Sequence, residues 1–282
     1  MKWLKCWVVI LFLLTAEVNA TPLIIRTGTV NKPFKVITWL NLGYNQTTKN
    51  YGWTTKKFLK EGVNPLATVS ADFLASVGLP LNLELGGVVP LMLKSQGANT
   101  SQGIGDILIV GRYGILQNSP LPVRAALSLA LSLPTGNKTA TPALGDGSTD
   151  IGFGLALNTI KLEAVVAHLR GAYWFNGKAN DTTRLGNMFE YMAGIDFPFL
   201  PKLTPQLAFT GYIQEQKMIK GTAQQNTEVN RALFNFLLLY QPIPKITLRP
   251  KFSVPISPLC KGETIADYYL GLDAWLTLPL SN

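Results

Sequence analysis

The sequence predicts an all-β fold: a closed antiparallel transmembrane β-barrel of about twelve strands, with short periplasmic turns and long outer loops. Three observations lead to this prediction. The chain is very apolar for its 282 residues, many segments alternate between apolar and mixed positions, and short connections between these segments alternate with long ones. Such a pattern is typical of strands that face lipid on one side and an enclosed interior on the other.

The composition argues against an ordinary soluble domain. Hydrophobic residues make up 47% of the chain and charged residues 15%, and the mean hydropathy is +0.20. Part of this apolar surface must therefore face lipid. A spanning helix needs about 20 consecutive apolar residues, and no stretch after the first twenty residues approaches that length. A closed barrel is the other structure that satisfies every backbone polar group inside a bilayer.

The first twenty residues have the pattern of a secretory signal peptide. Lys2 and Lys5 precede an apolar stretch from Cys6 to Leu14, which is too short to cross about 30 Å of hydrocarbon as a helix. We expect cleavage near Ala20, leaving residues 21–282 as one barrel domain in the outer membrane of a bacterial cell. The alternative is an uncleaved start to a soluble domain.

Removing the signal peptide changes both the charge and the cysteine count. Two lysines and one glutamate are lost, so the formal charge falls from +9 to about +8. Cys260 remains as the single cysteine, which excludes a disulfide within the mature chain.

Alternation with a period of two recurs along the whole chain. From Leu121 to Leu133 every odd position is apolar, whereas the even positions include Arg124, Ser128 and Ser132. We expect strands at residues 35–44, 66–77, 80–92, 103–116, 121–133, 148–159, 161–175, 187–198, 203–215, 229–241, 244–256 and 265–278. The register of segment 161–175 stays open, because its apolar residues occur on both faces.

The connections between these strands alternate in length. The short ones, expected in the periplasm, are residues 78–79, 117–120, 160, 199–202 and 242–243. The long, polar ones, expected outside the cell, are residues 45–65, 93–102, 134–147, 176–186, 216–228 and 257–264. The segment before the first strand, residues 21–34, has two possible placements: a plug inside the lumen or a leader in the periplasm.

Side chains on the mixed face of each strand are expected to line the lumen. The candidates are Asp106, Arg112, Arg124, Asp150, Gly152, Gly154, Glu190, Asp196, Arg249, Lys251, Asp267 and Asp273. Opposite charges on the last two strands favour pairing of Arg249 and Lys251 with Asp267 and Asp273, and contact with a solute is the alternative. The small residues Gly152 and Gly154 leave room for a solute path or a plug, or let the sheet bend.

Two stretches resemble a known family. The run GIGDILIVGRY at 103–113, followed by LSLPTG at 131–136 and LGDGSTDIG at 144–152, is similar to motifs of outer-membrane barrels associated with the meta-pathway of phenol degradation. The resemblance covers about residues 79–157. It implies a channel or transporter for small hydrophobic or aromatic solutes, distantly like channels for long-chain fatty acids and aromatic hydrocarbons. A structural or surface-interaction barrel without a transport role is the alternative.

One departure from such barrels concerns the last residues. Outer-membrane barrels usually finish on an aromatic residue that the barrel insertion machinery reads, whereas this sequence finishes at Leu278-Pro279-Leu280-Ser281-Asn282. The resemblance implies that this machinery is a partner. The missing aromatic residue bears on how efficiently the machinery assembles the barrel, more than on the fold.

The residues do not suggest an enzyme, and we expect no catalytic, cofactor-binding or metal-binding residues. His168 is the single histidine, with no nucleophile at a suitable spacing and no cysteine or second histidine for a zinc site. The sequence pI is about 9.5, but many lysines, such as Lys56, Lys57 and Lys60, fall in expected loops. They are better placed to meet outer-membrane lipid and lipopolysaccharide than nucleic acid, and they favour anionic or weakly acidic solutes.

Overall fold

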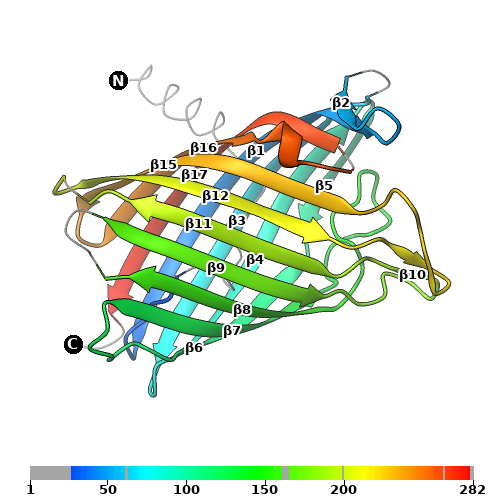
Figure 1. Ribbon diagram of the computed structural model, residues 1–282. Coiled ribbons are helices and arrows are strands. Elements are labelled where there is room, and N and C mark those ends of the chain that lie inside the picture. Colours follow the sequence, from blue (N-terminus) through cyan, green and yellow to red (C-terminus); the bar gives the residue numbers. More distant parts are fainter. Residues whose placement is uncertain (1–26, 61–62, 161–164, 199, 263, 280–282) are drawn as a thin grey trace, which may run out of the picture.

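The chain forms one closed antiparallel barrel, seen in a computed structural model that describes residues 27–60, 63–160, 165–198, 200–262 and 264–279 (Figure 1). The expected signal peptide and the first part of segment 21–34 lie outside the described residues. No helix in the described ranges is long and apolar enough to cross a membrane.

Twelve strands make up the described wall of the barrel, which confirms the predicted fold class. They are β1 (Lys35–Gly52), β3 (Leu66–Leu79), β4 (Leu83–Gln96), β6 (Ile107–Gly114), β7 (Val123–Leu133), β8 (Asp150–Thr159), β9 (Val166–Phe175), β11 (Met188–Asp196), β12 (Leu203–Gln214), β15 (Val229–Ile243), β16 (Ile246–Pro255) and β17 (Thr264–Pro279). Each pairs with its neighbours along the chain, and β17 pairs with β1 from Lys35↔Pro279 onwards, which closes the ring.

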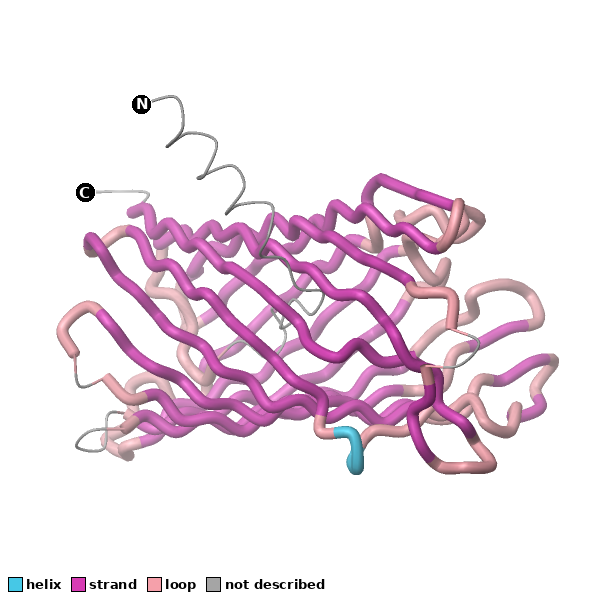
Figure 2. The backbone as a smooth tube through the Cα atoms, turned by 90° about the horizontal axis from the view of Figure 1, so that it is seen from above, coloured by secondary structure: helices cyan, strands magenta, loops and turns pink. Residues whose placement is uncertain are grey.

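Shorter elements belong to the outer loops and their hairpins. They are β2 (Lys57–Leu59), β5 (Asn99–Ile104), β10 (Thr183–Arg184), β13 (Met218–Ile219), β14 (Thr222–Ala223) and the 3₁₀ turn η2 (Ser257–Leu259). The wall strands run obliquely across the barrel, and the long loops gather at one end of it (Figures 1 and 2). We call this the loop end, and the opposite end, where the short connections lie, the turn end.

The alternation of the sequence becomes an inner and an outer face. In β8 the side chains of Ile151, Phe153 and Leu155 are between 42% and 52% exposed, while Gly152 and Gly154 are buried. The outer surface therefore presents rows of exposed Leu, Ile, Val and Phe side chains over most strands. Exposure of so much apolar surface to water is unfavourable, whereas the acyl chains of a bilayer can cover it.

Two of the expected outer loops are shortened because their wall strands continue further than predicted. β1 continues to Gly52 and returns as β2, and β4 continues to Gln96 before a tight hairpin at Gly97 leads into β5. The stretch after Tyr44 is polar on both faces, so it lacks the apolar alternation that marks a spanning strand. Backbone pairing alone extends these hairpins beyond the apolar band of the wall.

The first turn at the turn end also differs from its predicted position. β3 runs through Gly78 and Leu79, and the turn is formed by Pro80, Leu81 and Asn82. Leu81 and Asn82 have φ angles of 61° and 59°, the left-handed values that tight hairpin turns use. Gly78 is therefore not a turn glycine, and its role lies in the lumen.

A proline inside β16 is accommodated by a gap in the hydrogen-bonded ladder. The register of β15 and β16 runs to Leu237↔Lys251 and resumes at Tyr240↔Leu248. Pro250 lies within this gap, because it has no N–H to donate to β15, while its pairing with Leu272 of β17 continues.

Charge placed on the outer face should cost most at mid-strand. Leu129, at the centre of β7, and Leu121, in the turn before it, are both 54% exposed. We expect Leu129→Arg to destabilise the protein folded in lipid vesicles, reducing its free energy of unfolding by about 2–4 kcal/mol. Leu121→Arg should reduce it by about 0–1 kcal/mol. Urea titration followed by the gel-mobility shift of unheated samples measures both. Equal costs would contradict the assigned outer face.

Candidate functional site

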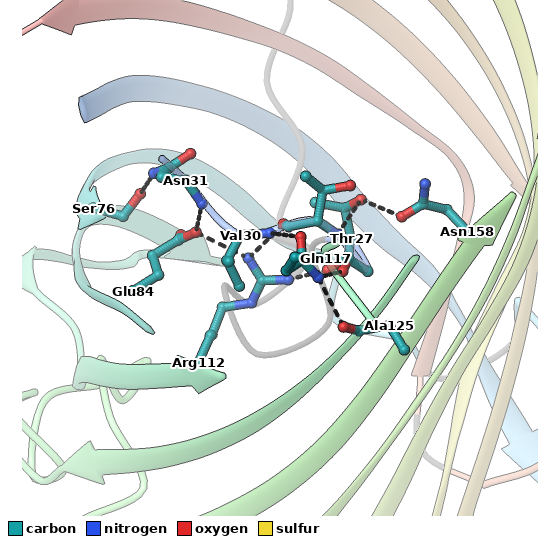
Figure 3. A network of polar contacts seen from close by, with 11 residues as sticks. Thr27, Val30, Asn31, Ser76, Glu84, Arg112, Gln117, Ala125 and Asn158 are labelled. Carbon is teal, nitrogen blue, oxygen red and sulfur yellow. Dashed lines mark hydrogen bonds and ion pairs between the residues drawn. The ribbon is translucent and has the colours of Figure 1, made fainter. Parts of the chain in front are cut away.

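The chain entering β1 lies inside the barrel. Residues 27–34, here called the luminal segment, cross the turn end and contact β3, β4, β6 and β8 from within (Figure 3). Of the two placements that the sequence left open for residues 21–34, the described part thus occupies the lumen.

A buried ion pair anchors the luminal segment. Glu84 and Arg112 are register partners on β4 and β6, their side chains are each 1% exposed, and Oε2 and Nη1 are 3.3 Å apart. The same carboxylate oxygen accepts the backbone N–H of Asn31 at 2.8 Å. The guanidinium also donates to the carbonyl oxygens of Thr27 and Thr29. The pair therefore presents both an acceptor and donors to the segment's backbone.

Side-chain amides and hydroxyls extend this network (Figure 3). Gln117, in the turn after β6, accepts the N–H of Val30 at 3.1 Å and donates to the carbonyl of Gly28 at 2.7 Å. The side chain of Asn31 donates to Ser76 at 2.9 Å, and that of Thr27 donates to Asn158 at 3.0 Å. Polar wall residues thus satisfy backbone groups that the segment would otherwise bury unpaired.

Two glycines make this close docking possible. A Cβ added to Gly78 of β3 would lie 2.0 Å from the carbonyl oxygen of Lys32, and one added to Gly28 would lie 2.3 Å from that of Arg124. Any side chain at either position would push the luminal segment away from the wall. Phe34, where the segment turns into β1, has a left-handed φ of 60°.

A cluster of apolar side chains follows the inner face of the wall around half of the ring. Its buried members and the side chains packed against them are Trp39, Leu74, Val88, Val110, Ala130, Ala172 and Trp174, with Ile37, Leu108, Met188 and Trp275. The cluster extends from β1 to β9, and five wall strands separate these two in either direction around the ring. The inner face of these strands thus has an apolar belt, with polar side chains on either side of it.

The sequence pattern did not reveal this cluster. Its members occupy the mixed face of each strand, where a single apolar residue among polar ones carries no signal. The tryptophans Trp39 and Trp174 were the available hint, since both lie on that face.

A cavity of about 500 Å³ separates the luminal segment from the opposite wall. It is lined by Thr27, Thr29, Val30, Asn31, Lys32, Lys35, Ile37, His168, Arg170, Asp196, Gln206, Leu239, Thr247, Arg249, Trp275 and Thr277. The wall residues among them come from β9, β11, β12, β15, β16, β17 and the start of β1, and all share the inward-facing parity of their strands.

Basic side chains dominate this cavity. Arg170 and Arg249 project from the wall, and Lys32 and Lys35 come from the luminal segment and the first residue of β1. The single carboxylate in the lining is that of Asp196.

Contacts hold two of these side chains in place. Asp196 lies 2.8 Å from Nε2 of His168 and accepts a second hydrogen bond from Gln206. Arg249 is fixed by Asp273 at 2.5 Å, and its guanidinium carbon lies 4.6 Å from the centre of the Trp275 ring.

Several of the predicted lumen residues lie on the inner face. Arg112, Asp150, Gly152, Gly154, Glu190, Asp196, Arg249, Lys251 and Asp273 share the inward parity of their strands. Asp273 pairs with Arg249 and also lies 3.8 Å from Lys251, as the cross-strand interpretation requires. Gly152 is the register partner of Trp174, so the missing side chain leaves room beside a large indole.

Three of the predicted lumen residues make other contacts, although Arg124 shares the inward parity of β7. Asp267 is 40% exposed and pairs with Lys49, because the β16–β17 register places Asp273 opposite Arg249 and Gly271 opposite Lys251, and Asp267 lies further along β17. Arg124 donates to the carbonyls of the turn at 119–123. Asp106 binds the loop after β7.

This role of Asp106 explains the motifs behind the family resemblance. Its carboxylate accepts the N–H of Gly136 at 2.9 Å and that of Asp146 at 3.0 Å. Ser148 then donates to Asp146 at 2.9 Å and to Asp150 at 2.6 Å. The shared motifs thus fold one outer loop onto the barrel rim, and they do not form the cavity.

A second hollow, of about 430 Å³, lies among the outer loops. Tyr51 and Trp53 of the β1–β2 hairpin line it together with Gln214, Glu215 and Lys217 beyond β12. Beside it, a hydrogen bond from Lys261 lowers the pKa of Glu228 to about 2. The same ammonium group lies 5.2 Å from the ring centre of Trp53, which ties the hairpin to the loops across the mouth.

Among the described residues, no three His, Cys, Asp or Glu side chains are placed to hold a metal ion.

The fold is similar to that of solved outer-membrane barrels. An outer-membrane channel from Pseudomonas putida F1 aligns with a TM-score of 0.79 and 14% identity, covering 93% of this chain and all of that one. The NanC porin aligns with a TM-score of 0.55 and 11% identity over 86% of this chain and all of its own. The β domain of the Bordetella autotransporter BrkA has a TM-score of 0.52 and 8% identity, covering 86% of this chain and 99% of that domain. At these identities the likeness concerns the fold alone.

Sequence comparison gives the family directly. Comparison with curated proteins finds no match. A family model described as "Putative MetA-pathway of phenol degradation" matches residues 25–252, which is most of the chain and includes the luminal segment, the motifs around Asp106 and most of the cavity wall. The chain therefore belongs to this family of phenol-degradation-associated barrel proteins, as its motifs indicated.

Proposed function

We propose that this protein is a channel of the bacterial outer membrane for small hydrophobic or aromatic solutes. The observation that carries the proposal is the apolar cluster on the inner wall together with the cavity that adjoins it. Ile37 and Trp275 both line the cavity and pack against the cluster, so the two form one continuous interior surface. A solute with an apolar body can be desolvated there without leaving the barrel.

A structural barrel without a transport role is the alternative. Such a barrel would need a packed interior and polar pairs, which the Glu84–Arg112 network supplies. It has no need for a cavity of about 500 Å³ at the edge of that packing, a volume within the range of about 300–1,000 Å³ typical of small-molecule sites. The family description and the likeness to a channel and a porin support the transport interpretation.

The outer membrane would supply the remaining partners. We propose that the exposed lysines of the outer hairpin, Lys56, Lys57 and Lys60, meet the anionic groups of lipopolysaccharide. The barrel insertion machinery would assemble the protein after signal-peptide cleavage near Ala20.

Detaching the luminal segment should enlarge the pore. We expect Gly78→Val to raise the single-channel conductance in planar bilayers, because its side chain cannot coexist with the carbonyl of Lys32 2.0 Å from the Cβ position. Gly111→Ala is the matched control, since a Cβ there meets nothing within 4 Å. An unchanged conductance in Gly78→Val would show that the segment does not limit the pore.

Aromatic solutes should interrupt the ion current. We expect phenol or benzyl alcohol to block single-channel currents of the wild-type protein transiently, whereas glycerol, which lacks an apolar ring, should not. We expect Val110→Asn, which places a polar group in the apolar cluster where Val110 is 1% exposed, to weaken this block about tenfold. Equal block by glycerol, or no current at all, would argue against the proposed function.

A further inference from the structure

The cavity at the turn end is lined by several charged side chains, which a purely apolar pore does not require. We infer that it is a binding site for a small aromatic carboxylate, whose ring lies against Trp275 and whose carboxylate meets the basic groups of the lining. This inference rests on the proposed function, because it names the class of solute that the channel would take.

The charges of the lining favour an anion. Lys32, Lys35, Arg170 and Arg249 face one carboxylate, that of Asp196. Outside the lining, Asp273 neutralises one charge at most while lying close to both Arg249 and Lys251. The lining itself therefore presents four basic groups and one carboxylate, a balance that favours an entering anion.

The one acidic group of the lining is held away from a solute anion. One oxygen of Asp196 lies 2.8 Å from Nε2 of His168, and the other accepts the side-chain amide of Gln206. Because a carboxylate only accepts hydrogen bonds, both neighbours must turn an N–H toward it. These donors stabilise its negative charge locally and reduce its repulsion of a second carboxylate.

The apolar part of the ligand has a surface prepared for it. Trp275 stacks under the guanidinium of Arg249, and Ile37 and Leu239 line the same cavity. Arg249 is also fixed by Asp273, so its position is set before a ligand arrives. A flat ring beside Trp275 and a carboxylate directed at Arg170 or Lys35 would use both kinds of surface at once.

Neutral and cationic rings serve as discriminating probes. Benzoate, benzyl alcohol and benzylamine have similar size and differ in charge. We expect titration of the purified full-length protein in detergent, followed by tryptophan fluorescence or calorimetry, to give tightest binding for benzoate and weakest for benzylamine. Equal or tighter binding of benzyl alcohol would overturn the inference.

Charge-removing variants locate the site. We expect Arg170→Gln and Lys35→Gln each to weaken benzoate binding about tenfold while leaving benzyl alcohol binding unchanged. Lys57→Gln removes an exposed lysine on β2, far from the lining, and should change neither. The gel-mobility shift of unheated samples verifies that each variant is folded. Unchanged benzoate binding in both folded cavity variants would also overturn the inference.

Equilibrium binding and ion current separate this inference from the proposed function. Selective benzoate binding in detergent without any current in bilayers would leave the carboxylate site standing and remove the channel. Block of the current by aromatic solutes, without preferential binding of benzoate, would support the channel and overturn the carboxylate site.

Discussion

The constraint on which the rest of the structure depends is the hydrogen bonding of the backbone inside lipid. Hydrocarbon offers no partner for an unpaired N–H or C=O, so a sheet can exist there only if its two edges meet. The pairing of β17 with β1 meets this requirement along most of both strands. Once the ring is closed, each strand has one face for acyl chains and one for an enclosed interior, and the number and tilt of the strands fix how wide that interior is. Pro250 is a local exception, because it has no N–H for the ladder with β15.

The interior is then filled in two unlike ways. On one side, the luminal segment is bound by a buried ion pair, an amide and two glycine contacts, all directed at its backbone. Removing one partner of such an ion pair leaves an unpaired buried charge, which typically costs about 3–5 kcal/mol. On the other side, the space is left open and its lining is basic and partly aromatic. The apolar cluster from Trp39 to Trp174 follows the inner wall and reaches this cavity through Ile37 and Trp275.

The sequence was sufficient to predict the strands of the barrel wall, but it was insufficient to predict the contacts inside the lumen. Period-two alternation in segments such as 121–133 predicted the strands, their number and the inward parity of Asp150, Glu190 and Asp273, because lipid imposes one rule on every outer position. The inner face obeys no comparable rule. Trp174 beside Gly152, or Glu84 beside Arg112, becomes meaningful only when register places the two together. The partner of Asp267 was missed because the register pairs Lys251 with Gly271, and the partners of Asp106 because they are backbone groups of a loop, at Gly136 and Asp146.

One half of the ring contacts the luminal segment and the other half lines the cavity, which has a consequence for how the sequence can change. The luminal segment binds to the wall from β3 to β8, through residues such as Ser76, Arg112 and Asn158. The cavity takes its opposite lining from β9 to β17 and from the start of β1. One arc of the barrel thus binds its own chain, while the other lines the cavity. If the cavity takes a solute as proposed, substitutions at Arg170 or Leu239 would change its preference without disturbing the contacts of the luminal segment. A barrel organised in this way could change its specificity by point substitutions alone.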